Sequence, residues 1–174
     1  MNLLNPMVFQ TTRLCIRPLT ETDFPAFHAM HTNPNVMQYT SRRHTQTLEE
    51  NKTELNELIA NYAKPDNTFW VWAVERKSDQ AFLGTCAFIV NEDNEYEIGF
   101  RLAEAYWGKG YGTEVAIGLI DYAMALPEVP GLVAYVFSEN IGSVRVLERT
   151  AMVLEREFYN EKEKCLDRVY RLNK

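Results

Sequence analysis

The sequence predicts an α/β fold of the α+β type, in which an antiparallel sheet is followed by helices and further strands. Two patterns support this expectation. Three strand-like runs in the middle of the chain are joined by short polar turns, which is typical of an antiparallel meander. Beyond them, a glycine-rich loop opens a helical pattern that leads into a continuous apolar run, as in a strand buried on both faces. The three runs cover residues 68–75, 82–91 and 95–102.

The N-terminal part of the chain is predicted to contain one strand and two helices. Apolar and polar residues alternate over 11–19, which is the period of a half-buried strand. A short helix is expected over 21–32. A second helix is expected over 47–63, because Thr47 and Glu50 have the spacing of a capping box and apolar residues recur on one helical face.

The C-terminal part is predicted to alternate between helices and strands. The helical pattern after the glycine loop runs over 111–126 and is ended by prolines. The strand, helix and hairpin that follow it are expected over 132–137, 141–149, 153–159 and 165–172.

Length and composition favour one compact domain. The chain has 174 residues, of which 46% are hydrophobic, and it contains no low-complexity linker. We therefore expect a single domain over 1–174, with residues 1–9 as a possible loosely ordered N-terminus.

Charge and cysteine usage exclude some classes of protein. The net charge of −6 argues against nucleic acid as the primary partner and mildly favours a cationic one. Cys15, Cys86 and Cys165 are odd in number and widely spaced, which disfavours a disulfide framework and a zinc site. We therefore expect no bound metal.

The sequence lacks a leader-like start and any run of 18 apolar residues. We therefore expect a cytoplasmic protein that does not enter membranes.

The glycine loop carries the strongest chemical signal. Glycines at 108, 110 and 112 directly before a helix let several backbone N–H groups converge on a phosphate. A nucleoside-triphosphate loop is excluded, because Lys109 is followed by Gly110 and not by serine or threonine. A dinucleotide loop is disfavoured, because Thr113 stands where the third glycine belongs. A merely flexible turn remains open at this point.

The chain resembles the GNAT N-acetyltransferase superfamily, and within it the RimJ/RimL-like branch (Acetyltransf_3 type). Three motifs, which occur in the same order as in that family, carry the resemblance. The likeness also includes the N-terminal strand and the turn at 33–37, so it spans almost the whole chain. The motifs are Glu97-Ile98-Gly99-Phe100, the loop Trp107-Gly108-Lys109-Gly110-Tyr111-Gly112-Thr113-Glu114, and Asn140-Ile141-Gly142-Ser143-Val144-Arg145-Val146-Leu147-Glu148.

The resemblance implies a mixed, mostly antiparallel central sheet that splays open after its fourth strand, with helices on both faces and acetyl-CoA in the split. It also implies two groups of cofactor-binding residues. One group is on the fourth strand, where the pantetheine arm pairs like an extra strand, and the other forms the pyrophosphate loop. They are Phe100, Arg101 and Leu102, and Gly108, Lys109, Gly110, Tyr111, Gly112 and Thr113.

The resemblance also suggests catalytic residues for direct attack of an amine on a thioester. Glu97 is a candidate general base, although a solvated strand carboxylate explains it almost equally well. A backbone N–H near Phe100 is expected to polarise the carbonyl. The tyrosine that many family members use as general acid is replaced by Leu147. In the RimL-like pattern Ser143 takes this role, and Asn140 contacts the pantetheine or acyl region; Ser143 could equally only satisfy backbone amides.

The acceptor is the least defined part of the interpretation. Tyr39 and Trp72 are expected to line the acceptor pocket, while the three histidines have no ligand spacing and are expected to be structural or exposed. The resemblance favours a protein N-terminus as acceptor, followed by a polyamine or another small amine, in a monomer or homodimer. Two alternatives stay open: a catalytically silent CoA-binding module and a nucleotide-binding oxidoreductase.

Overall fold

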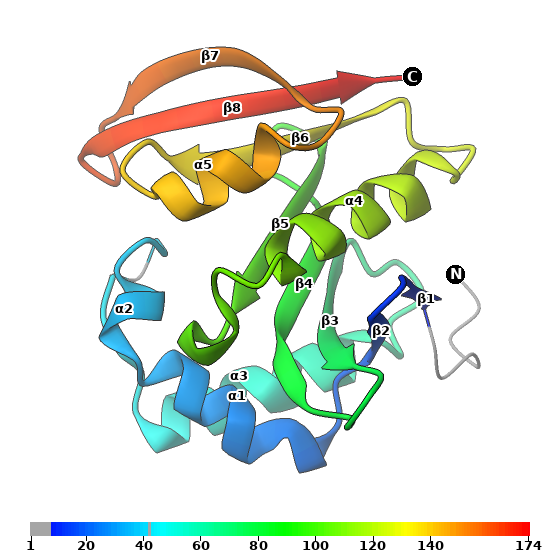
Figure 1. Ribbon diagram of the computed structural model, residues 1–174, viewed down its shortest axis with the longest axis vertical. Coiled ribbons are helices and arrows are strands. Elements are labelled where there is room, and N and C mark those ends of the chain that lie inside the picture. The colour runs from blue at the N-terminus through cyan, green and yellow to red at the C-terminus, as the bar shows by residue number, and fades with distance from the viewer. Residues whose placement is uncertain (1–7, 42) are drawn as a thin grey trace.

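The computed structural model describes residues 8–41 and 43–174. One sheet of eight strands runs through the described chain, in the order β1-β2-β3-β4-β5-β6-β8-β7 (Figure 1). All neighbouring strands are antiparallel except β5 and β6. The strands are β1 (Phe9–Gln10), β2 (Leu14–Pro18), β3 (Phe69–Arg76), β4 (Phe82–Val90), β5 (Tyr96–Leu102), β6 (Gly131–Phe137), β7 (Val153–Asn160) and β8 (Cys165–Asn173).

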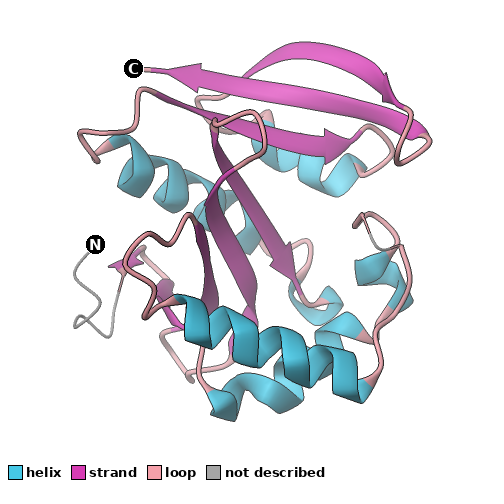
Figure 2. Cartoon of the chain, turned by 180° about the vertical axis from the view of Figure 1, so that it is seen from behind, coloured by secondary structure: helices cyan, strands magenta, loops and turns pink. Residues whose placement is uncertain are grey.

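Helices cover both faces of the sheet, as Figures 1 and 2 show from opposite sides. The side chains of Ile98, Phe100 and Leu102 on β5 pack toward α4, and we call this side the α4 face. The opposite side, which carries Glu97 and Arg101, is the α1 face, because Arg101 bonds to a histidine of α1. The helices are α1 (Phe24–His31), α2 (Pro34–Met37), α3 (Leu48–Asn61), α4 (Tyr111–Met124) and α5 (Ile141–Leu147).

Most of the expected elements are confirmed within a few residues of their predicted ends. The capping box forms as predicted: Thr47 Oγ1 accepts from the N–H of Glu50, and the Glu50 carboxylate accepts from the N–H of Thr47. The fold class is confirmed as well, since the sheet is mixed and mostly antiparallel.

The structure corrects two expectations at the N-terminal end. Phe9 belongs to β1 and pairs with Ile16, so it is not loosely ordered as proposed for residues 1–9; residues 1–7 lie outside the described part of the chain. The predicted turn after α1 contains the short helix α2, because the Asn33 side chain caps it by accepting from the N–H of Asn35.

The sheet splits between β5 and β6. Within the described residues, their parallel pairing consists of one register pair, Glu97 with Val133, so beyond Glu97 the two strands diverge. The split follows the fourth of the predicted strands, as expected. Strand β8 then inserts between β6 and β7, which gives a smaller second half of the sheet against which α5 packs (Figure 1).

Candidate functional site

The glycine loop leads into α4, which begins at Tyr111 as predicted, so Gly112 to Glu114 lie in the first turn of the helix. Gly108 and Gly110 have φ values of 70° and 81°, which residues with side chains rarely adopt. The first intrahelical bond at this end joins the N–H of Glu114 to the carbonyl of Gly110. The N–H groups of the preceding residues 111–113 therefore have no partner within the helix, and they are available to an anion together with the positive end of the helix dipole.

Arg13, which no motif of the sequence marks, fixes the orientation of this loop. Its Nη1 donates to the carbonyl oxygen of Lys109 at 3.1 Å. In a trans peptide, the C=O and the following N–H point in opposite directions, so the N–H of Gly110 is turned away from Arg13. Arg13 therefore presents a loop N–H outward, toward where a ligand would lie.

Glu114 holds Arg13 in this position. Its carboxylate accepts from Arg13 Nε at 2.6 Å, from the backbone N–H of Arg13 at 2.7 Å and from the Thr11 hydroxyl at 2.6 Å. Burial opposes ionisation of Glu114, but these hydrogen bonds outweigh it and keep the pKa of the carboxyl below its ordinary value. The last residue of the predicted motif is thus a support for the loop.

In the predicted loop, two side chains are already engaged and one glycine is required by close packing. Tyr111 is buried, with the Arg13 guanidinium 4.2 Å from its ring centroid, so only its backbone faces outward. Lys109 Nζ donates to the carbonyl of Ala105 at 2.7 Å. A Cβ at Gly112 would lie 3.1 Å from a methyl of Val146, so this glycine allows α4 and α5 to approach closely.

The backbone of β5 exposes hydrogen-bonding groups to the split. The N–H of Ala103 bonds to β4, and because strand residues alternate in direction, the N–H and C=O of Phe100 and Leu102 face away from β4. The carbonyl of Leu102 is occupied by the indole N–H of Trp107 at 2.8 Å. Phe100 lies beyond the single β5–β6 register pair, so its N–H and C=O point into the split.

Glu97 lies where β6 leaves β5, on the α1 face. Its Oε2 accepts from the Asn91 amide at 3.2 Å. Burial raises the pKa of the Glu97 carboxyl above its ordinary value, Asn91 lowers it, and the nearby charge of Glu95 raises it further. A half-buried carboxyl of this kind can accept a proton at a higher pH than a solvated strand carboxylate. This property is more typical of a general base than of a carboxylate with no catalytic role.

Asn140 and Ser143 lie at the start of α5, on the α4 face. Asn140 Oδ1 accepts from the backbone N–H of Ser143 at 3.2 Å, so Asn140 caps the helix. In the described residues, the Ser143 hydroxyl forms no hydrogen bond, so the expected alternative in which it only satisfies backbone amides is not observed. Ser143 and Glu97 therefore belong to opposite faces of the split.

The two predicted pocket residues have different surroundings. Trp72 is only 2% exposed and its ring packs edge-on against Tyr122 of α4. It is a core residue, and we do not retain it in the acceptor pocket. Tyr39 follows α2 and is half-buried. His31 is buried and structural, since its Nδ1 bonds to the carbonyl of Phe27 and its Nε2 to Arg101 at 2.6 Å.

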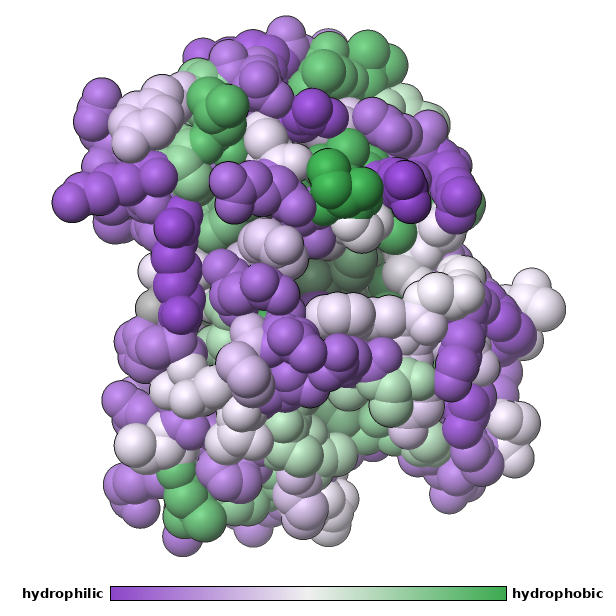
Figure 3. Space-filling view, turned by 60° about the vertical axis from the view of Figure 1, so that its left-hand side comes forward, coloured by the Kyte–Doolittle hydropathy of each residue, from purple (hydrophilic) through white to green (hydrophobic). Residues whose placement is uncertain are grey.

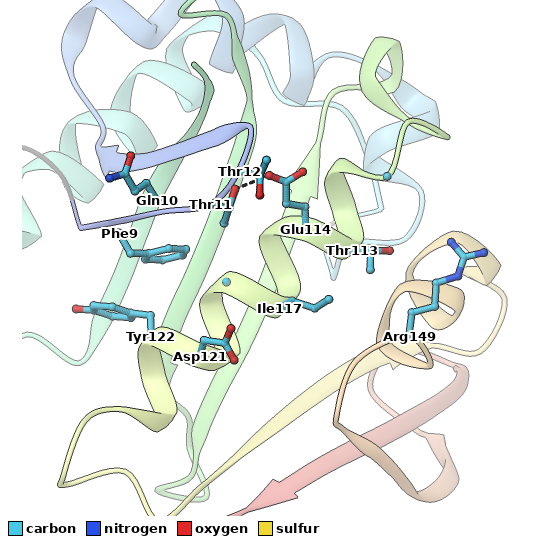
Figure 4. Close-up of a pocket in the computed structure, with 12 residues that line it drawn as sticks. Phe9, Gln10, Thr11, Thr12, Thr113, Glu114, Ile117, Asp121, Tyr122 and Arg149 are labelled. Carbon is cyan, nitrogen blue, oxygen red and sulfur yellow. Dashed lines mark hydrogen bonds between the residues drawn. The ribbon is translucent and has the colours of Figure 1, made fainter. Parts of the chain in front are cut away.

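Two concave surfaces adjoin these residues. A trough of about 750 Å³ crosses the outer side of α4, from Phe9 and Gln10 past Gly110 and Thr113 to Arg149 (Figure 4). Figure 3 shows a hollow between the part of the molecule with β6 to β8 and the part with α1 and α2. Arg149 gave no signal in the sequence, because only the packing of α5 beside α4 brings it to the trough.

The split sheet with a helix-capping glycine loop defines the architectural class of this protein, and solved structures share it. A GNAT-family acetyltransferase from Bacillus anthracis superposes with a TM-score of 0.82 at 24% identity, covering 94% of this chain and 96% of that one. RimL, a ribosomal L7/L12 α-N-protein acetyltransferase solved with coenzyme A, superposes with a TM-score of 0.81 at 17% identity, covering 96% and 97%. At these identities the likeness concerns the fold alone.

The sequence comparisons then identify the family. The uncharacterized N-acetyltransferase YoaA of Bacillus subtilis is 25% identical over 142 residues, which are 80% of this chain and 79% of YoaA. The family model of the acetyltransferase (GNAT) domain matches residues 13–153. The chain belongs to the GNAT acetyltransferases, and the resemblance inferred from the three motifs is confirmed. No helix among the described residues is long and apolar enough to cross a membrane.

Proposed function

We propose that this acetyltransferase moves the acetyl group of acetyl-CoA to a primary amine by direct attack within the split between β5 and β6. One observation carries the proposal. The split is bounded on the α4 face by a loop of outward N–H groups and on the α1 face by Glu97, whose pKa is raised. The two reactants can therefore enter from opposite faces and meet at the backbone of β5.

The residues present fit CoA as the donor. The loop offers unpaired N–H groups at the start of α4 for the pyrophosphate, and Phe100 offers an N–H and a C=O for the amides of the pantetheine arm. The trough continues from Gly110 and Thr113, and Arg149 at its far end is a cation for a further phosphate. The donor supplies the acyl group and a thiolate leaving group.

Each step of the transfer has a candidate residue. Glu97 takes a proton from the amine as its nitrogen attacks the thioester carbonyl, and the N–H of Phe100 stabilises the oxyanion that forms. When the carbon–sulfur bond breaks, the Ser143 hydroxyl gives its proton to the departing thiolate and is reprotonated from solvent. The products are an N-acetyl amine and the free CoA thiol, with the proton of the amine left on Glu97.

We further propose a protein N-terminus as the acceptor and the cytoplasm as the place of action. The support for this acceptor is the RimL fold neighbour, a ribosomal L7/L12 α-N-protein acetyltransferase. Release of the CoA thiol, measured with a panel of N-terminal peptides, polyamines and small amines, tests two things. It shows whether the protein transfers the acetyl group at all, and which class of amine it accepts. Acetyl-CoA binding without thiol release for any acceptor would contradict the enzymatic role and favour a silent CoA-binding module.

A further inference from the structure

Gly99 is a glycine that the fold itself does not require. Six of the eight glycines have either a left-handed backbone or an atom within 3.1 Å of the position that a Cβ would take. Gly99 has neither, and nothing lies within 4 Å of a Cβ built on it. Glycine weakens the interior of a strand, so an unconstrained one there indicates that its open space serves another purpose. The other unconstrained glycine, Gly142, is exposed in α5.

The open space at Gly99 lies on the α1 face, next to the proposed base. Strand alternation puts Glu97, Gly99 and Arg101 on the same side of β5. On β4, the residue opposite Gly99 is Ala87, so a glycine and an alanine face each other across the two strands. The result is a depression with the Glu97 carboxyl at one end and the hydrogen-bonded pair of Arg101 and His31 at the other.

We propose that Gly99 determines acceptor specificity: the depression over Gly99 and Ala87 receives the substituent on the carbon that bears the amine. This rests on the proposed function, with Glu97 as the group that takes the proton of the amine. Neighbouring side chains on one face of a strand are about 7 Å apart. An amine within hydrogen-bond reach of Glu97 therefore has the substituents of its carbon beside position 99.

The chemical class that fits is an α-amine with a small substituent, such as the first residue of a peptide. In that group the amine-bearing carbon carries both a side chain and a carbonyl. A straight-chain amine, such as a polyamine or a lysine side chain, has no branch at this carbon and would leave the depression empty. Gly99 thus separates two acceptor classes that the family fold alone does not.

The test compares the wild type with Gly99→Ala and Gly99→Val on two acceptors, a peptide that begins with serine and a straight-chain diamine. One methyl group that competes with the substrate for space in a hydrophobic pocket costs about 10- to 200-fold in kcat/KM. We expect Gly99→Ala to lose about that factor with the peptide, Gly99→Val to lose more, and the diamine to change by less than about threefold. CoA affinity, measured by calorimetry, should stay unchanged in both variants.

A reciprocal variant controls for damage to the strand. Gly99→Ala combined with Ala87→Gly moves one methyl across the strand pair while the composition stays the same. The double variant should regain at least part of the activity on the peptide, and its melting temperature should equal that of Gly99→Ala. Equal losses for both acceptors, no loss for either, or no recovery in the double variant would overturn the role of Gly99. Failure of the wild type to acetylate any acceptor would instead overturn the proposed function.

Discussion

The two faces of β5 are organised in opposite ways. On the α4 face, the site is made of backbone N–H groups that other residues hold in place: Arg13 bonds to the loop and Glu114 bonds to Arg13. On the α1 face, the site is made of side chains around open space, with Glu97 beside Gly99. The first arrangement suits a ligand that never changes, and the second suits a ligand that can differ from one relative to another.

Because the two faces differ in this way, we expect mutations to affect CoA binding and the reaction of the acceptor amine separately. A change on the α1 face should alter turnover, pH dependence or acceptor choice, and it should leave CoA affinity intact. A change in the support of the loop should do the reverse. A variant that changes both CoA affinity and the turnover, pH dependence or acceptor choice would contradict the division between the faces.

Glu97→Gln should give the largest effect, because it removes the proposed base while its size and its bond from Asn91 can persist. We expect kcat to fall by about 10²- to 10⁴-fold. Since the pKa of Glu97 is raised, kcat/KM of the wild type should increase as the pH rises through that raised pKa, and this limb should vanish in the variant. Calorimetry should give an unchanged CoA affinity; a loss of binding would mean that Glu97 supports the fold and not the chemistry.

Ser143→Ala should have the next largest effect and tests the α4 face. We expect kcat to fall by at least about tenfold, with CoA affinity spared, because the alanine lacks the proton that the thiolate needs. An activated thioester whose thiol leaves without protonation should be affected less. Unchanged turnover with acetyl-CoA would remove Ser143 from the mechanism and leave the thiolate to solvent.

Arg13→Gln should weaken CoA binding without slowing the chemistry. Loss of the bond to the Lys109 carbonyl frees that peptide to rotate, and one net hydrogen bond contributes about 1 kcal/mol. The expected result is a rise of about fivefold in the KM for acetyl-CoA at constant kcat. Arg156→Gln, which removes the same charge on β7, is the matched control and should leave this KM unchanged. A fall in kcat for Arg13→Gln would contradict a role limited to the loop.

Much of the α4 face could be predicted from the sequence, because its function depends on backbone geometry that glycine encodes directly. The loop, the start of α4 and the start of α5 are local features, and each is found where the sequence indicated. Arg13 was missed as a support because it reaches Lys109 from a distant segment, and only the packing of the turn between β1 and β2 against α4 reveals that contact.

The α1 face could be predicted only in part. Glu97 was identified because it begins a motif, but nothing local distinguishes Gly99 from a glycine that relieves strain. Trp72 was misplaced for a related reason: an aromatic residue in a strand can face a pocket or the core, and the register with β4 decides between them. Pocket shape arises from contacts between distant segments, so composition and periodicity do not reveal it.

The smallest expected effect concerns Asn91, whose amide donates to Glu97. Because this bond stabilises the carboxylate, Asn91→Ala should raise the pKa of Glu97 further and move the acid limb of kcat/KM to higher pH. At pH values below the pKa of Glu97, kcat/KM should be a few-fold lower than in the wild type, while kcat/KM at high pH and the CoA affinity should stay the same.

A second variant separates this electrostatic effect from damage to the turn. Asn91 Oδ1 also accepts from the N–H groups of Asp93 and Glu95, and Asn91→Asp can keep both bonds. The new charge beside Glu97 disfavours its ionisation, so Asn91→Asp should shift the limb in the same direction and by more than Asn91→Ala. If the turn alone mattered, Asn91→Asp would behave like the wild type. An acid limb that ignores both substitutions would mean that it belongs to the amine, and the α1 face would lose its proposed base.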